Sequence, residues 1–184
     1  MPDTIHSSTI FPEVLFVDRP TFEDDRGFFR EFFRLGELEE AAGHPVTFVQ
    51  ANHSRSKRAV LRGVHVASYE KLIYVLRGEA IVVLVDLREG SPRFGKHEML
   101  TLGDSRRTSI FLPAGFGNSF YVASEEVEYC YMVAEYYDPA KEKNIKWDDP
   151  DLAIPWPDMH PVLSARDLER AKSVRELYPK QFQK

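Results

Sequence analysis

Short runs of β-branched and aromatic residues, separated by turn signals, follow one another through most of this 184-residue sequence. Such a succession is typical of antiparallel sandwiches and barrels, whereas a βαβ fold would place long helical segments between the strands. We therefore expect an all-β barrel of the jelly-roll type with a few short helices. The predicted strands are Glu13–Val17, Phe28–Phe33, Thr47–Ser54, Val60–His65, Lys71–Arg77, Glu79–Asp86, Gly95–Leu102, Ser109–Leu112, Ser119–Val122 and Val127–Glu135.

Helical and unstructured segments are few. Glycine bounds one short predicted helix at Gly36–Gly43, and Ala165–Ser173 predicts a second near the end of the chain. The last dozen residues, 173–184, are rich in lysine and glutamine and are expected to form a loosely held tail. The length suits one domain over residues 1–184, with its core at about 10–170.

Composition excludes several classes of partner and location. The chain carries 24 Lys plus Arg against 29 Asp plus Glu, a formal net charge of −5, and no sustained basic block, which argues against nucleic-acid binding. Cys130 is the single cysteine, and the N-terminal residues MPDTIHSSTIFPEV lack the features of a signal peptide. The longest apolar run, AIVVLVDL, has the length of a strand. We expect a soluble, cytoplasmic protein without a membrane or nucleic-acid partner.

A small jelly-roll barrel suggests the cupin architecture, in which a metal site is the first chemistry to test. Metal-binding cupins supply His-x-His and a Glu from one strand and another His shortly after a Pro-x-Gly turn. Here Ala67 stands two residues after His65, and Asn118 stands where the second His would follow Pro113–Gly115. A single imidazole does not make a transition-metal site, so we expect no metal and no other cofactor.

His65 itself lies in the strand-like stretch LRGVHVASYEKLIYVLRG, six residues before Lys71. A lone histidine in a strand is usually structural, and a lysine in a strand is usually solvated at an edge. An imidazole is also the side chain whose ordinary pKa best suits proton transfer near neutral pH. The stretch alone leaves these readings open.

Nine motifs, in order, resemble the dTDP-4-dehydrorhamnose 3,5-epimerase family, whose members are metal-free cupin-fold enzymes that act on nucleotide-linked 4-keto-6-deoxy sugars. The resemblance covers most of the chain, from Phe22 to about Asp167. The motifs are FEDDRGFFREFF, FVQANHSRS, LRGVH, KLIYVLRGEA, VDLREGSPRFG, LPAGFGNSF, YMVAEYYDP, IKWDDPDLAIPWP and LSARD.

The resemblance implies a set of catalytic residues. Removing a proton next to the C4 ketone gives an enolate, so epimerisation needs a base on one face, an acid on the other and a polar group at the oxygen. His65 matches the family's base, and Asp167 matches the carboxylate that orients it. Tyr131 matches the acid, and Lys71 matches the lysine at the enolate oxygen. On residue type alone, Asp167 also suits a helix N-terminus and Tyr131 a core position.

Further positions match substrate-binding residues of the family. Arg62 is expected to face the pyrophosphate, and Gln50 and Asn52 should share one face of a strand because side chains alternate along it. The resemblance further implies that nucleoside contacts come from the partner subunit of a homodimer, so that the site is shared. The residues implied in substrate binding are Phe22, Arg26, Glu31, Gln50, Asn52, Arg62, Asn118 and Tyr137.

Three departures from the family's pattern leave the sugar open. Asn118 replaces a histidine, Met132 replaces a lysine, and the segment 66–70 between His65 and Lys71 is shortened. Epimerisation at C3, at C5 or at both fits the sequence. The alternatives are a sugar-nucleotide 3,4-ketoisomerase, and a sugar-nucleotide-binding cupin without activity.

Overall fold

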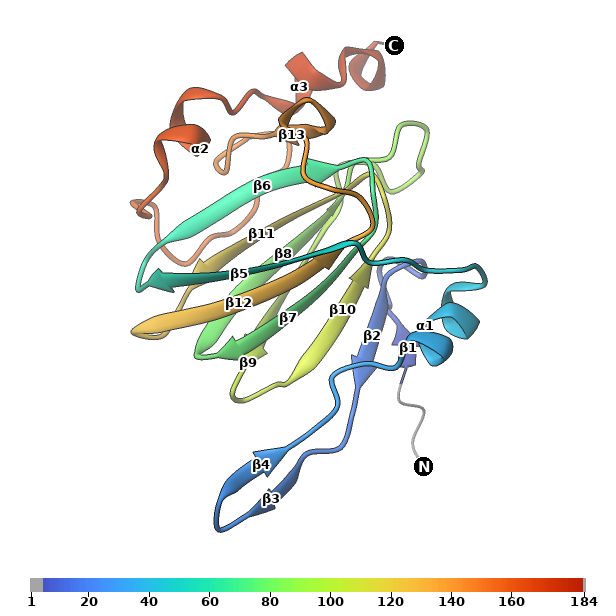
Figure 1. Ribbon diagram of the computed structural model, residues 1–184. Helices are drawn as coiled ribbons and strands as arrows, with labels where there is room; N and C mark the ends of the chain where they lie inside the picture. The colour runs from blue at the N-terminus through green and yellow to red at the C-terminus, as the bar shows by residue number, and fades with distance from the viewer. Residues whose placement is uncertain (1–4, 184) are drawn as a thin grey trace.

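Two antiparallel sheets stack face to face in the computed structural model, which describes residues 5–183 (Figure 1). One has six strands in the order β1-β2-β10-β7-β12-β5, and the other has five in the order β13-β6-β11-β8-β9. This is the predicted all-β jelly-roll barrel. The strands are β1 Ile5–Ser7, β2 Leu15–Asp18, β3 Phe22–Asp24, β4 Gly27–Phe29, β5 Gln50–Lys57, β6 Leu61–Ala67, β7 Lys71–Arg77, β8 Glu79–Asp86, β9 His97–Gly103, β10 Thr108–Leu112, β11 Phe116–Val122, β12 Glu126–Val133 and β13 Glu142–Asn144.

The strand β8 shows why the longest apolar run of the chain does not alternate with polar residues. Val82 and Leu84 point into the core between the two sheets, together with Ile73 of β7. Val83 and Val85 point to the other face, into a second apolar cluster. A strand that is buried on both faces reads as a continuous hydrophobic run.

The second cluster is closed by the C-terminal part of the chain. The helices α2 (Ala165–Glu169) and α3 (Val174–Leu177) lie beyond β6, at the end of the barrel opposite β3 and β4 (Figure 1). Val174 and Tyr178 are 1% and 4% exposed and pack against this face of the five-stranded sheet.

The prediction of a loosely held tail over 173–184 is therefore wrong for the described residues. The polar residues around Val174 and Tyr178 make the segment look like an exposed tail, although these two side chains are buried. Ser173 begins α3 with a capping box to Glu176. A short 3-10 helix, η2 (Pro179–Phe182), follows α3, and Lys184 lies outside the described residues.

The outer face of the six-stranded sheet is covered by the helix α1 (Leu35–Ala42). Leu38 is fully buried there against Leu72 and Phe111. The helix ends at Gly43, which adopts φ 75°. None of the helices formed by residues 5–183 is long and apolar enough to span a membrane.

The predicted strand Phe28–Phe33 is shorter than expected. Only Gly27–Phe29 is a strand, and it pairs with β3 in a hairpin that projects from the barrel (Figure 1). Residues 30–33 beyond it form no strand, and Phe32 stacks on Tyr74 at 5.1 Å between ring centroids. Aromatic residues are common in paired strands and also in segments outside a sheet that pack against it, so the sequence pattern alone did not distinguish these two structures.

Candidate active site

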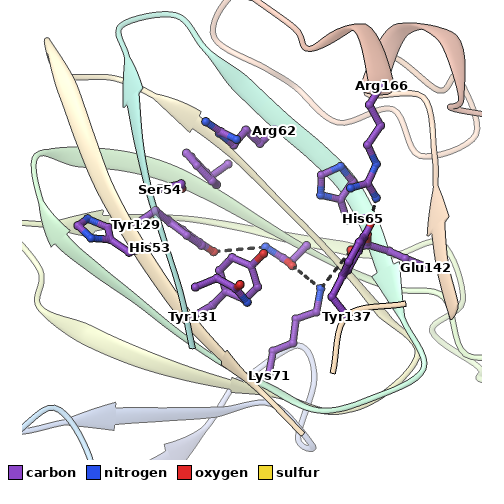
Figure 2. Close-up of a pocket in the computed structure, with 13 residues that line it drawn as sticks. His53, Ser54, Arg62, His65, Lys71, Tyr129, Tyr131, Tyr137, Glu142 and Arg166 are labelled. Atoms are coloured by element: carbon purple, nitrogen blue, oxygen red, sulfur yellow. Dashed lines mark hydrogen bonds and ion pairs between the residues drawn. The ribbon is translucent and has the colours of Figure 1, made fainter. Parts of the chain in front are cut away.

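A cleft of about 300 Å³ opens between the two sheets, beside β5, β6 and β12 (Figure 2). His65, Lys71 and Tyr131 point toward its common space. The cleft combines polar and aromatic walls, as small-molecule sites do. Predicted site residues that line it are Asn52, Arg62, His65, Lys71, Asn118, Tyr131 and Tyr137.

β6 holds Arg62 and His65 on either side of a glycine that the geometry requires. Gly63 adopts φ 112°, and a Cβ atom there would lie 2.8 Å from the backbone oxygen of Asn118. Real Cβ atoms do not come so close to a carbonyl, so only glycine lets β6 approach β11 here. The register of β11 shifts between Asn118 and Phe120 at the same place.

His65 is oriented by a carboxylate from the far end of the chain. Its Nε2 lies 2.7 Å from Oδ1 of Asp167, whose Oδ2 accepts a hydrogen bond from Ser164 Oγ at 2.8 Å. Burial raises the pKa of Asp167, but the hydrogen bond and charge of His65, the hydrogen bond from Ser164 and the charge of Arg166 together outweigh it, so that this pKa lies below its ordinary value. The ionised carboxylate favours the tautomer with a proton on Nε2, which leaves Nδ1 free to accept one. Nδ1 has no hydrogen-bond partner within residues 5–183.

Lys71 is a buried lysine, not the solvated edge lysine that is common in strands. It is 4% exposed, and its Nζ donates to Asn118 Oδ1 at 3.4 Å and lies 3.9 Å from Glu142 Oε1. The Nζ atom also lies 5.9 Å from the ring centroid of Tyr131. Burial lowers the pKa of Lys71, and Glu142 opposes that shift. A desolvated ammonium of this kind acts strongly on charge that develops nearby.

Tyr131 comes from β12 of the six-stranded sheet, whereas His65 comes from β6 of the five-stranded sheet. Both line the cleft, so they approach its contents from opposite sheets. Burial raises the pKa of Tyr131, which keeps its phenol protonated and able to donate a proton.

Asn118 uses both ends of its amide within the protein. Its Oδ1 accepts from Lys71, and its Nδ2 donates to the hydroxyl of Tyr129 at 3.3 Å. The residue thus links the lysine to a buried tyrosine that stacks on Phe120 at 4.1 Å. A positioning role for Asn118 fits these contacts better than the direct substrate contact implied by the sequence.

The remaining predicted binding residues divide into two groups. Gln50 and Asn52 share one face of β5, as predicted, and Gln50 Nε2 donates to Asn52 Oδ1 at 2.8 Å. Gln50 lies in a pocket that adjoins the cleft, together with Tyr137. Arg62 is fixed by a 2.9 Å hydrogen bond from its Nε to Ser56 Oγ.

The second group lies away from the cleft of this chain. Phe22 and Arg26 belong to the projecting β3–β4 hairpin, with 62% of Phe22 and 90% of the Arg26 side chain exposed. Glu31 follows the hairpin and pairs with Arg19 and Arg34. Within one chain, these three residues do not join the other predicted site residues.

The cleft residues that are absent from the sequence prediction include Glu142 and Arg166. Glu142, on β13, pairs with Lys71 and with Nη2 of Arg166, which also donates to Asn144 Oδ1 at 3.1 Å. Arg166 directly precedes Asp167 in the motif LSARD, so its position was available as a signal. Glu142 lies in the charged stretch AKEKN, where nothing separates it from ordinary surface residues.

No group of three or more His, Cys, Asp or Glu side chains is arranged to hold a metal ion in the part of the chain that the structure describes. Beside His65, the cleft is lined by a lysine, two arginines and three tyrosines. This donor set suits proton transfer and anion binding.

Known proteins share both the sequence and the fold. A family model described as dTDP-4-dehydrorhamnose 3,5-epimerase matches residues 8–175. A protein of that description from Pseudomonas aeruginosa is 44% identical over 160 residues, which cover 85% of this chain and 88% of the relative. A dTDP-4-dehydrorhamnose 3-epimerase from Streptomyces niveus is 40% identical over 148 residues, which cover 78% of this chain and 72% of the relative.

Among solved structures, dTDP-6-deoxy-D-glucose-3,5-epimerase from Legionella pneumophila Philadelphia 1, in complex with dTDP-4-keto-L-rhamnose, is similar with a TM-score of 0.88. It is 37% identical, and the match covers 96% of this chain and 95% of that one.

Proposed function

The chain belongs to the dTDP-4-dehydrorhamnose 3,5-epimerase family, and we propose that it inverts C3, C5 or both in a nucleotide-linked 4-keto-6-deoxyhexose. The observation that carries this proposal is the 2.7 Å contact between His65 and Asp167 in a cleft that also holds Lys71 and Tyr131. Relatives include both a 3,5-epimerase and a 3-epimerase, so both outcomes belong to the proposal.

The first step removes a proton from the carbon beside the ketone. Nδ1 of His65 takes the proton, and the electron pair of the C–H bond moves to the ketone oxygen as an enolate. Asp167 stabilises the imidazolium that results, because its carboxylate is already ionised and in contact with Nε2. Lys71 faces the enolate oxygen and stabilises its charge.

The second step returns a proton to the opposite face of the same carbon. The phenol of Tyr131 supplies it from the facing sheet, and the enolate carries its electron pair back into the new C–H bond. The tyrosinate then regains a proton, and the imidazolium loses one, by exchange with solvent. The reaction is an isomerisation, so no electrons enter or leave and no co-substrate is needed.

Nucleotide binding completes the proposal. Arg62 at one end of the cleft suits the pyrophosphate, because a guanidinium binds two phosphate oxygens at once. The projecting hairpin with Phe22 and Arg26 would supply nucleoside contacts to the cleft of a second subunit in a homodimer. A cytoplasmic location stays a prediction from the sequence.

Hydrogen exchange tests this function directly. The protein is incubated with dTDP-4-keto-6-deoxyglucose in deuterated buffer, and C3 and C5 are followed by NMR. Deuterium at one or both positions supports the epimerase, and the pattern shows which carbon is inverted. Absence of deuterium at both, beside an active reference enzyme, would remove the claim for this substrate. A shifted carbonyl signal would indicate a ketoisomerase, and binding without exchange a non-catalytic protein.

A further inference from the structure

The shortened segment 66–70 comprises the end of β6 and the three residues that lead into β7, and two backbone hydrogen bonds hold it in place. The backbone N–H of Gly115 donates to Ala67 O at 2.9 Å, and that of Ala134 donates to Glu70 O at 3.1 Å. The side chain of Glu70 pairs with His44 at 2.7 Å on the outer side. These contacts fix the direction of the residue between them, Tyr69.

Tyr69 points inward, to the same side as Lys71. It is 6% exposed and packs in an apolar cluster with Ala67 and Val133, against which Tyr131 is also packed. The Nζ of Lys71 lies 5.8 Å from the centroid of its ring, nearly the same distance as from the ring of Tyr131. The ammonium therefore lies beside two tyrosine rings, of which the proposed mechanism uses only one.

The hydroxyl of Tyr69 makes no hydrogen bond to the described residues 5–183 and is not among their buried unsatisfied polar atoms, so it is accessible from the pocket that the residue lines. The ring lines the pocket that adjoins the cleft, shared with Gln50, Tyr131 and Glu142. Burial raises the pKa of Tyr69 to about 12, so that the phenol is neutral and can donate. An unused donor in a polar pocket favours an oxygen atom of a ligand.

We propose that Tyr69 is a substrate-binding residue that donates a hydrogen bond to an oxygen of the hexose beside Lys71, and that it contributes to the choice of sugar. This inference rests on the proposed function, since the ligand is the same sugar nucleotide. Lys71 faces the ketone in that function, so the ligand atoms nearest to Tyr69 belong to the hexose and not to the nucleoside. The short segment 66–70 places the phenol of Tyr69 beside Lys71.

The substitution Tyr69→Phe tests the proposal, because it removes one oxygen and keeps the ring that packs on Val133. Affinities are measured by calorimetry for dTDP and for dTDP-quinovose, a 6-deoxyhexose conjugate without the ketone. Loss of one hydrogen bond should weaken dTDP-quinovose binding by about tenfold and leave dTDP binding unchanged. The matched control is Tyr136→Phe, at a tyrosine that is 73% exposed, with both affinities at the wild-type value.

Unchanged affinity for dTDP-quinovose in Tyr69→Phe would overturn the proposal. An equal loss for dTDP would overturn it too, since the contact would then be to the nucleotide. If Tyr69→Phe does not fold, Tyr69→Gln, which keeps a donor, is compared with Tyr69→Met, which does not, and the glutamine variant should bind dTDP-quinovose more tightly. These readouts need no turnover, so failure of the exchange assay on the wild-type protein is a separate result.

Discussion

The Nε2 atom of His65 lies 2.7 Å from the Oδ1 atom of Asp167, although 102 positions separate the two residues in the sequence. The contact joins the five-stranded sheet to the C-terminal segment, so that packing of that segment determines the orientation of the imidazole. Ser164 holds the other carboxylate oxygen and at the same time caps α2 through the backbone N–H of Asp167. The two hydrogen bonds between Ser164 and Asp167 thus cap the start of α2 and also position the carboxylate that contacts the proposed base.

Replacing the proposed base is the most direct test of the mechanism. His65→Asn should lower the rate of deuterium exchange by a factor of about 100 to 10,000, the usual contribution of a positioned general base. Nucleotide binding should be largely spared, because Arg62, the proposed pyrophosphate ligand, is positioned by Ser56 and not by His65. The rate is measured by NMR in deuterated buffer, and dTDP affinity by calorimetry. Exchange at the wild-type rate in this variant would refute the role of His65.

A second test separates activity from stability at Lys71. Lys71→Met keeps the aliphatic stem and removes a buried charge that has only a 3.4 Å hydrogen bond and a 3.9 Å ion pair to offset its burial. We expect the exchange rate to fall by about 100-fold or more, because the enolate loses its cation. The melting temperature should stay equal or rise. A variant that retains activity would show that Lys71 does not face the reacting oxygen.

The fold was largely predictable because its strands carry local signals. Lys71–Arg77 and Glu79–Asp86 were predicted with the bounds that the structure has, since β-branched residues and an intervening glycine mark both. The strands β1, β3 and β13 were missed, because three residues contain too little pattern to read. Their existence depends on the neighbours with which they pair.

The site was predictable only where residues match a family motif. His65, Lys71 and Tyr131 do so, and they share the cleft. Glu142 was missed because only its ion pairs with Lys71 and Arg166 mark it as a site residue. These partners lie 71 and 24 positions away in the sequence, and the fold brings them together. The inward direction of Tyr69 likewise follows from contacts of Ala67 and Glu70 that no sequence pattern contains.

The C-terminal anchor gives a third prediction, on stability. Tyr178 is 4% exposed and meets Phe94 edge-on at 5.3 Å between ring centroids. Tyr178→Ala should lower the free energy of unfolding by about 3 kcal/mol, as expected for deleting a buried aromatic ring. Lys180→Ala, two residues on and exposed, is the matched control and should change it by no more than about 0.5 kcal/mol. Urea unfolding measures both, and equal effects would indicate a loosely held tail after all.

A fourth prediction concerns pH. Asp86 is fully buried, and its carboxylate accepts hydrogen bonds from Arg88 and Ser91 at 2.7 Å each. Burial raises the pKa of Asp86, but these bonds, a hydrogen bond from the Arg88 backbone and the charge of Arg88 together outweigh it and bring the pKa below its ordinary value. Folding therefore favours the ionised form, and this stabilisation is complete above the ordinary carboxyl pKa of about 3.9. It disappears as the pH falls through the lowered pKa of the folded state.

Asp86→Asn should accordingly be less stable than the wild type by about 2 kcal/mol at pH 7, where the carboxylate is fully ionised. The difference should shrink below pH values of about 4 as the wild-type carboxylate becomes protonated. Urea unfolding at a series of pH values measures it. A difference that stays constant down to acid pH would mean that the charge of Asp86 does not stabilise the fold.

The last prediction tests whether two subunits share each site. Arg26, on the projecting hairpin, would act in the partner's cleft, whereas His65 acts in its own. Arg26→Glu homodimers should bind dTDP poorly, because an acidic side chain would repel the nucleotide, and His65→Asn homodimers should bind it but not catalyse exchange.

In a mixed dimer, one site carries both defects and the other carries neither. Each mixed dimer keeps one intact site of its two, so the activity of purified mixed dimers should return to about half of the wild-type value. If the hairpin served the cleft of its own chain, every site in the mixture would carry one defect, and activity would not return. The two variants are co-expressed with different tags, and the mixed dimers are purified through both tags before exchange is measured.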